Sequence, residues 1–519
     1  MGGSFGRNVV TVGALTAVSR VLGFVRDMVM AWLLGAGLLA DAFVVAYRLP
    51  NLLRRFMAEG AVSVAFVPVF SEVKEREGLE SAYELARKVF TLMSAALGAV
   101  AVLGILASPL LVAVVAPGFV GREVFGVTVH LTRIMFPYIL LIGVAALFMG
   151  VLNSVGHFAM PAAAPIVMNV FMIGVPVIMH VVFRIFDSPA DALAWGVIAG
   201  GVAQIIIQIP ALRARGIRVG IETGLMSPRV KKVVRLVGVA SLGASIYQIN
   251  VLVGTLLASM LPQGSVSYLY YANRILELPL GVFAFAVGNV LLPSMSSARA
   301  RMEMERLSEI MGKGSLAVLL FTIPASVGAI VLAEPIFSVL FIRGRFTWAD
   351  AQGCASALIM YGVSLWAVGY TRIQTQALYA LQKARSAVTV SWVALVANVA
   401  LCLALMPVLG HAGIALAGSL SVFLQLVLQR RVTRREGIRV PREYLLESLK
   451  MTLAALAMGT LLVPFALLDM WKQGPSLVSA SVLGGCVVAG SGVYFLLLKV
   501  LGVKSFETAL QRIMHRGSW

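Results

Sequence analysis

Apolar segments long enough to cross a membrane follow one another along almost the whole chain, separated by short polar segments. A spanning helix needs about 20 apolar residues, and only helices and closed barrels satisfy their backbone hydrogen bonds inside lipid. The segments are rich in Leu, Ala, Val and Gly and lack the alternation of barrel strands, so the sequence predicts an all-α polytopic membrane protein. We count fourteen spans, at 9–34, 40–70, 87–115, 125–151, 160–183, 191–211, 233–260, 265–296, 314–341, 350–379, 387–407, 411–429, 446–468 and 477–498.

Composition supports this fold class. Of the 519 residues, 60% are hydrophobic and 13% charged, with a mean hydropathy of +0.93, which excludes a soluble globular protein. The first span is too long for a signal peptide and carries charged residues, so we expect the mature protein to keep it. Cys354, Cys402 and Cys486 lie far apart in apolar spans without metal-binding or redox spacing, and we interpret them as buried small hydrophobic residues.

Lysine and arginine are distributed unevenly between the two predicted sides of the membrane. With the N-terminus inside, the inner segments hold 29 of the 42 basic residues and the outer segments hold 5, while 8 lie within spans. This positive-inside pattern predicts that both termini are cytoplasmic. The net charge of +19 is therefore explained by basic residues that set the orientation in the membrane and contact anionic lipid headgroups. For this reason we do not expect nucleic acid as a partner.

Short motifs recur at an offset of 225 to 229 residues, which predicts a duplicated fold. The pairs are Phe66-Val67-Pro68 with Leu291-Leu292-Pro293, Ala107-Ser108-Pro109 with Ala333-Glu334-Pro335, Gly118 with Gly344, and Asn169-Val170 with Asn398-Val399. Six spans separate equivalent positions, so the two copies should be parallel. We predict an N-lobe of six spans (1–211), a basic linker (212–232), a C-lobe of six spans (233–429), a cytoplasmic loop (430–445), two extra helices (446–498) and a cytoplasmic tail (499–519).

Ionisable residues concentrate in three of the spans. Each costs at least about 2.5 kcal/mol at the bilayer centre, so it usually faces a partner or water. The set comprises Arg20, Arg26 and Asp27 in span 1, Asp41, Arg48, Arg54, Arg55 and Glu59 in span 2, and Arg274 and Glu277 in span 8. These are six arginines and four acids. Guanidinium groups suit phosphate oxygens, so the excess predicts an anionic ligand, and a pyrophosphate could contact several of them.

The spacing of these residues suggests partners for some of them. Arg20 and Asp27 are seven apart and share a helix face, with Arg26 about 120° away, so Asp27 could neutralise one arginine and leave another available. Pro50 should interrupt span 2 before Arg54. Arg274 and Glu277 are three apart and can pair, and Pro279 should end that helix.

Structural roles are the alternatives. Arg274 and Glu277 could form an ion pair that only stabilises the fold, Arg26 beside Asp27 could serve helix packing, and Arg54 could extend to the membrane interface. No phosphate-binding loop, zinc motif or nucleophile elbow is present, so we expect neither an enzyme nor a metal site.

The charged motifs of spans 1, 2 and 8 resemble those of the MurJ/MviN family of lipid II flippases, within the multidrug, oligosaccharidyl-lipid and polysaccharide exporter superfamily. The matching segments are Ser19 to Asp27, Asp41 to Phe43, Leu49 to Arg55, Ala58 to Ala61, Tyr270 to Pro279, and Leu291 to Pro293.

The resemblance implies fourteen helices, two lobes around a central cationic cavity, and alternating access. It implies that four arginines bind the substrate: Arg20, Arg26, Arg54 and Arg274. It also implies that Asp41 and Glu277 act as gating or charge partners. We add Asp27 to these partners because of its position beside Arg26. It also implies that the last two helices hold the lipid tail. Some members bind sodium through carboxylates on helices 7 and 11, whereas this chain has Gln248 and Asn250 in span 7 and no acid in span 11.

We therefore expect an inner-membrane flippase that moves lipid II from the inner to the outer leaflet for peptidoglycan synthesis, without a cofactor. The membrane potential or an ion gradient could supply the energy. Expected partners are lipid II and membrane lipids, with cell-wall synthesis proteins as further candidates. The alternatives are a flippase for another polyprenyl-pyrophosphate oligosaccharide, a cation-coupled drug antiporter and a non-transporting scaffold.

Overall fold

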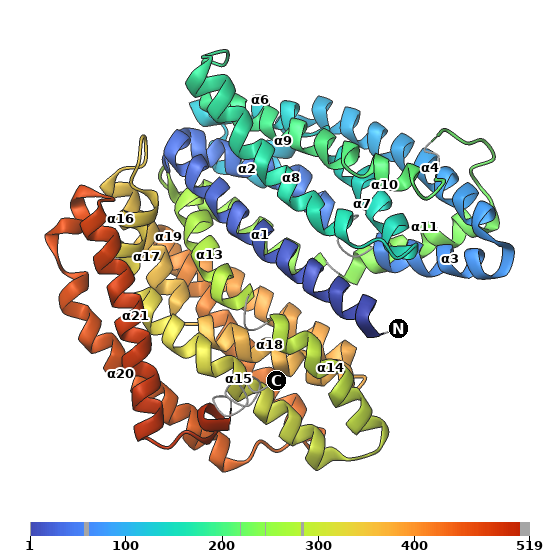
Figure 1. Ribbon diagram of the computed structural model, residues 1–519. Helices are drawn as coiled ribbons and strands as arrows, with labels where there is room; N and C mark the ends of the chain where they lie inside the picture. The colour runs from blue at the N-terminus through green and yellow to red at the C-terminus, as the bar shows by residue number, and fades with distance from the viewer. Residues whose placement is uncertain (1, 57–61, 218–219, 244, 282–284, 509–519) are drawn as a thin grey trace. The chain divides into compact units, whose positions relative to one another are not determined.

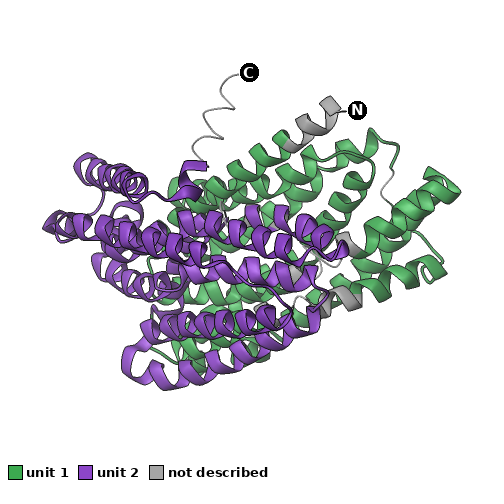
Figure 2. Ribbon diagram, turned by 90° about the horizontal axis from the view of Figure 1, so that it is seen from below, with its two compact units in different colours: residues 1–263 green, residues 264–519 purple. Residues whose placement is uncertain are grey.

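The computed structural model describes residues 2–56, 62–217, 220–243, 245–281 and 285–508 (Figure 1). Every regular element in this part of the chain is a helix, which confirms the predicted all-helical class. The chain divides into two compact units, residues 1–263 and residues 264–519 (Figure 2).

The first unit holds the N-terminal helices. They are α1 (Gly2–Leu34), α2 (Leu38–Phe56), α3 (Val62–Glu77), α4 (Leu79–Leu106), α5 (Ser108–Val115), η2 (Pro117–Phe119), α6 (Glu123–Met135), α7 (Tyr138–Ser154), α8 (Ala159–Pro176), η3 (Val177–Val182), α9 (Pro189–Ile206), α10 (Ile209–Arg213), α11 (Pro228–Gly243) and α12 (Ser245–Ser259). Among the closest helix pairs are α8 with α9, α1 with α8, and α2 with α6. One buried cluster around Phe66, Phe70 and Tyr83 joins α3, α4 and α7.

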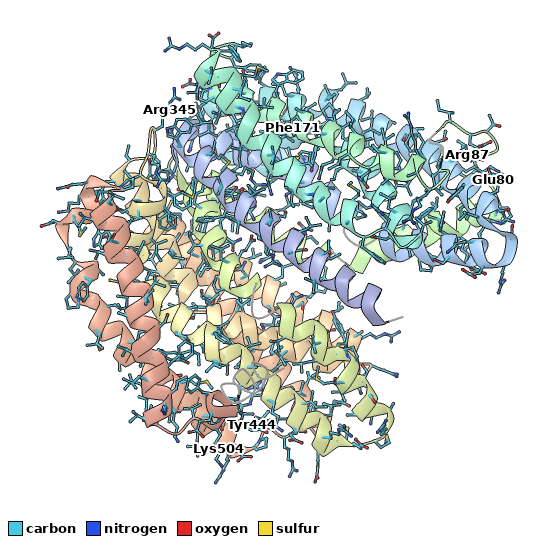
Figure 3. The ribbon with its side chains drawn as sticks, in the orientation of Figure 1. Glu80, Arg87, Phe171, Arg345, Tyr444 and Lys504 are labelled. Atoms are coloured by element: carbon cyan, nitrogen blue, oxygen red, sulfur yellow. The ribbon has the colours of Figure 1, made fainter. Side chains whose placement is uncertain are left out.

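The second unit holds the remaining helices. They are α13 (Ser265–Pro279), α14 (Phe285–Ala300), α15 (Met304–Val331), α16 (Ala333–Phe341), α17 (Trp348–Gly362), α18 (Leu365–Ala380), α19 (Ala384–Arg435), α20 (Arg442–Ala466), η5 (Asp469–Gln473) and α21 (Leu477–Val500). At its centre, α15 packs against α18 and α20. Tyr444, labelled in Figure 3, occupies the space beside Gly312, where an added Cβ would lie 2.3 Å from the ring.

The structure supports a multi-span protein but does not confirm the count of fourteen. Within the described residues, eight helices are long and apolar enough to cross a membrane, or nine if α17 and α18, which meet at 44°, form one span. Each of the predicted spans 40–70, 233–260 and 265–296 overlaps two described helices, with residues outside the described ranges between them. Conversely, α19 contains two predicted spans in 52 residues and is broken only at Gly410, whose φ of 58° is left-handed.

Two pairs of helices follow one another at the offset of the repeated motifs. The short helix α5 begins at Ser108 and its counterpart α16 begins at Ala333, 225 residues later. Each follows a long helix, α4 or α15, and each has a proline of the repeated motif in its first turn, Pro109 or Pro335. The helices on either side keep nearly the same offset, because α4 and α15 begin at Leu79 and Met304.

The two units divide later in the chain than the predicted lobes do. The sequence places the start of the second lobe at 233, whereas α11 and α12 belong to the first unit. The reason is packing: α11 lies against α3 and α4, and α12 lies against α2, α5 and η2. The Gly118 amide donates to the Ser259 hydroxyl over 3.2 Å, and the backbone of Ser259 leaves no space for a Cβ on Gly118.

The last two helices are part of the second unit's core. Tyr494 of α21 is 1% exposed and donates its hydroxyl proton to the Leu320 carbonyl of α15 over 3.1 Å. Trp471, between α20 and α21, is also 1% exposed and donates to the Phe465 carbonyl. Large apolar side chains cover the opposite faces of both helices and are exposed, as expected of helices that meet lipid.

Candidate functional site

Helix α1 presents the first three candidate residues in its second half. It runs without a break from Gly2 to Leu34, so neighbouring residues differ by about 100° around its axis. Arg26 donates from Nε and Nη2 to Oδ1 of Asp27 over 3.0 and 2.7 Å. The Arg26 side chain is 12% exposed and the Asp27 side chain 3% exposed. Asp27 therefore neutralises its neighbour Arg26, and this pair is largely removed from water.

A third residue, Asn169 of α8, completes the environment of Arg26. Its Oδ1 accepts from Arg26 Nη1 over 3.2 Å, and its Nδ2 donates to the Ser19 carbonyl of α1 over 3.0 Å. Gly23 lies opposite this amide, where an added Cβ would lie 3.5 Å from Nδ2. Asn169 thus connects α8 to two turns of α1 and fixes the direction of the Arg26 guanidinium. The sequence identified Asn169 only as part of the repeated motif, because the contact joins residues 143 positions apart.

Arg20 has a different environment from Arg26. Its side chain is exposed, two turns from Asp27 on the same helix. Within the part of the chain that the structure describes, its guanidinium has no hydrogen-bond or ion-pair partner. Its five N–H donors are thus available to an acceptor from outside the unit.

Helix α2 carries the next candidates. Asp41 is 2% exposed in the first turn, where the positive end of the helix dipole favours a carboxylate. Arg48 donates from Nη1 to the Thr255 hydroxyl of α12, a partner that the sequence did not suggest. The expected interruption at Pro50 is wrong, since α2 continues through this residue to Phe56. The backbone of Arg54 belongs to the last turn, but its side chain lies outside the described residues, as do those of Arg55 and Glu59.

Helix α13 of the second unit carries Arg274 and Glu277, which pair as their spacing predicts. Arg274 Nη1 donates to Glu277 Oε2 over 2.6 Å, and Glu277 Oε1 also accepts from Asn273 over 3.1 Å. Tyr270 supports the arginine twice: its hydroxyl accepts from Nη2 over 3.2 Å, and its ring lies 4.8 Å below the guanidinium carbon. The side chains of Arg274 and Glu277 are 23% and 40% exposed, so this pair is more open than that of Arg26. The helix ends at Pro279, as predicted.

The geometry divides the candidate arginines by their partners. Arg26 and Arg274 are each held by one carboxylate and by one further polar residue, Asn169 or Tyr270. Arg20 has a full positive charge that no described carboxylate offsets. Held guanidinium groups present fixed donors with little loss of entropy on binding, and an uncompensated one supplies attraction for an anion.

The described residues offer little for metal or thiol chemistry. No group of three or more His, Cys, Asp or Glu side chains among them could hold a metal ion. Cys354, Cys402 and Cys486 are buried free thiols, as predicted.

The chain is similar to known proteins over nearly its whole length. The family model described as "Lipid II flippase MurJ" matches residues 30–479. The lipid II flippase MurJ of Burkholderia cenocepacia is 33% identical over 506 residues, which cover 96% of this chain and 98% of that protein. A probable lipid II flippase MurJ of Rhizobium tropici is 34% identical, over 96% of this chain and 94% of that protein.

Solved structures show the same fold. A lipid II flippase MurJ in an inward closed conformation has a TM-score of 0.80 at 23% identity, covering 95% of this chain and 98% of that one. An inward-facing multidrug resistance MATE family transporter has a TM-score of 0.67 at 14% identity, covering 82% and 97%.

Proposed function

The chain belongs to the lipid II flippase MurJ family, and from this premise we propose that arginines of both units bind the pyrophosphate of lipid II during transport. The protein is a multi-span transporter that translocates lipid II, and it is not an enzyme. Its role in peptidoglycan synthesis follows from that substrate. Arg20, Arg26, Arg54 and Arg274 are the proposed substrate contacts, and Asp27, Asp41 and Glu277 are their proposed gating or charge partners.

The proposal rests mainly on the environment of Arg20. An exposed guanidinium without a carboxylate partner among the described residues is costly on a membrane helix unless an anion or water contacts it. A pyrophosphate provides oxygen acceptors that match the fork of donors on an arginine, whereas an organic cation would be repelled. Arg26 and Arg274, which already have fixed directions, would add donors from helices α1 and α13.

We further propose how the cycle uses these groups. Binding of the anionic headgroup would reduce repulsion among the arginines and favour the change from inward-open to outward-open access, while the lipid tail stays beside α20 and α21. The inside-negative potential favours outward movement of negative charge by about 2.3 kcal/mol per charge per 100 mV. In this scheme the chain has fourteen membrane helices in two parallel lobes, both termini are cytoplasmic, and no cofactor takes part.

The test measures lipid II on the outer leaflet of cells that depend on this chain. Arg20→Ala should lower the exposed lipid II at least about tenfold, because the loss of charge-assisted hydrogen bonds weakens binding by that order. Arg20→Lys should retain part of the activity, since it keeps the charge and loses the paired donors. Arg385→Ala removes an exposed arginine at the start of α19 and is the matched control.

Equal lipid II exposure in Arg20→Ala and Arg385→Ala, at equal protein levels in the membrane, would reject Arg20 as a substrate contact. The names of the relatives favour lipid II over other oligosaccharide lipids. Purified protein should therefore bind lipid II more tightly than organic cations, and the reverse order would favour a drug antiporter.

A further inference from the structure

A small basic pocket lies within the second unit, at the end of α19, and its lining residues do not include those of α13. It is formed by α15, α18, α19 and the segment that follows α19, and it has an empty volume of about 230 Å³, part of which is open to solvent. Its lining includes Met311, Tyr370, Gln374, Arg430, Arg434 and Ile438. Because part of this volume is open solvent, we expect the pocket to hold only a single small group.

The two arginines of this pocket lack carboxylate partners. Arg430 and Arg434 are four residues apart on α19, so they lie on one face and their charges repel. Within the described residues, neither guanidinium forms an ion pair or a side-chain hydrogen bond. Glu436 follows closely in sequence, but its Oε1 is already paired with Lys383 over 2.9 Å.

Gln374 provides a second, independent observation at this pocket. It is 0% exposed, and neither Oε1 nor Nε2 has a hydrogen-bond partner among the described residues. A buried amide without partners is unfavourable and uncommon, which calls for a bound group or water at this point. The nearby Gln429 does not satisfy it, because its Nε2 donates to the Thr375 hydroxyl over 2.9 Å.

We propose that this pocket binds a phosphate group. Arg430 and Arg434 of α19 and Gln374 and Tyr370 of α18 all line the pocket and carry hydrogen-bond donors, and a phosphate has several oxygens that can accept from such groups. A carboxylate has only two oxygens for the same donors. The phosphate can come from free inorganic phosphate or from the headgroup of an anionic lipid, since the predicted topology places this end of α19 at the cytoplasmic surface.

The first arm of the test uses free phosphate on the full-length protein in a neutral detergent. Inorganic phosphate, titrated against chloride at constant ionic strength, should raise the thermal midpoint of the unmodified protein with saturation. The pocket variant Arg430→Gln/Arg434→Gln should weaken this binding at least about tenfold. The control variant Arg431→Gln/Arg435→Gln removes two exposed arginines with the same spacing on the same helix, outside the pocket, and should behave as the unmodified protein.

The second arm uses lipid nanodiscs containing phosphatidylglycerol diluted in phosphatidylcholine. If the source is a lipid, native mass spectrometry should find fewer retained phosphatidylglycerol molecules on the pocket variant than on the control variant. Free phosphate would then have little effect. A difference between the two variants in either arm supports the site and identifies its source, and equal behaviour in both arms overturns it.

Two safeguards separate a lost site from a damaged fold. Both double variants should elute from size exclusion as the unmodified protein does and should share its thermal midpoint without ligand. Tyr370→Phe removes one hydroxyl and should weaken phosphate binding by a smaller factor. This variant tests the site a second time and changes the protein by a single hydroxyl group.

Discussion

Removal of the Asp27 carboxylate is the sharpest test of how α1 holds Arg26. Asp27→Asn keeps the shape of the side chain and one oxygen acceptor, but it removes the charge that neutralises Arg26. The pair has N–O distances of 2.7 and 3.0 Å and side-chain exposures of 12% and 3%. Loss of one partner from a buried ion pair costs about 3 to 5 kcal/mol. Arg26 keeps its bond to Asn169, so we expect about 3 kcal/mol or somewhat less.

The pair on α13 provides a matched comparison. Arg274 and Glu277 also lie within hydrogen-bond distance, at 2.6 Å, but their side chains are 23% and 40% exposed. Water that reaches such a pair screens it, which limits its contribution to about 1 kcal/mol or less. The two pairs therefore differ in burial more than in geometry, and the energies should follow burial.

Double-mutant cycles measure both couplings. One cycle combines Arg26→Gln with Asp27→Asn, the other combines Arg274→Gln with Glu277→Gln, and each free energy of unfolding comes from titration of the detergent-solubilised protein with SDS. We expect a coupling of about 2 kcal/mol or more for the first pair and below about 1 kcal/mol for the second. A coupling under about 0.5 kcal/mol for Arg26 and Asp27 would refute the reasoning, because neighbours that do not interact are additive within that range.

Two further predictions concern the first unit. Gly118→Ala should destabilise the protein by about 1 to 3 kcal/mol, because the new Cβ would lie 2.2 Å from the Ser259 carbonyl oxygen. Gly126→Ala is the control: nothing lies within 4 Å of its new Cβ, so it should stabilise α6 by about 0.5 to 1 kcal/mol. Equal thermal midpoints for the two variants would contradict this prediction. The Glu72 carboxylate accepts a hydrogen bond from Lys232 over 2.6 Å, and this bond and the lysine charge hold its pKa below the usual range. A carboxylate whose pKa is lowered in the folded state stabilises that state above its unfolded pKa, and this stabilisation is lost as the pH falls. The difference in thermal midpoint between the unmodified protein and Glu72→Gln should therefore be constant near pH 7 and disappear below about pH 4. A difference that grows in acid would exclude this pair as the cause.

Local spacing predicted part of the candidate site. The contact between Arg274 and Glu277 was predictable because residues three apart on a helix are neighbours. The bond from Arg26 to Asn169 was not, since it joins α1 to α8, and no periodic pattern specifies which helices pack together. Asn169 did stand out as one of the repeated residues, which was the only signal available for it.

The fold shows the same limit. Hydropathy predicted an all-helical membrane protein, because helix formation and apolar span length depend on the sequence within one element. It did not specify that α12 would pack against α2, α5 and η2, because such contacts, including that of the Gly118 amide with the Ser259 hydroxyl, join residues far apart in the sequence. It also did not predict that Pro50 would lie inside a continuous helix, where neighbouring groups must compensate for the lost hydrogen bond.

The break in α19 has a consequence for the register of everything after it. Only Gly410 separates the two halves of this helix, so there is no loop in which a length change could be absorbed. One residue inserted beside Gly410 would turn the second half by about 100° and shift it by about 1.5 Å. Twenty positions further on, Arg430 would then leave the face that lines the phosphate pocket. The direction of a charged group at one end of the unit is therefore set by chain length at a glycine about 30 Å away.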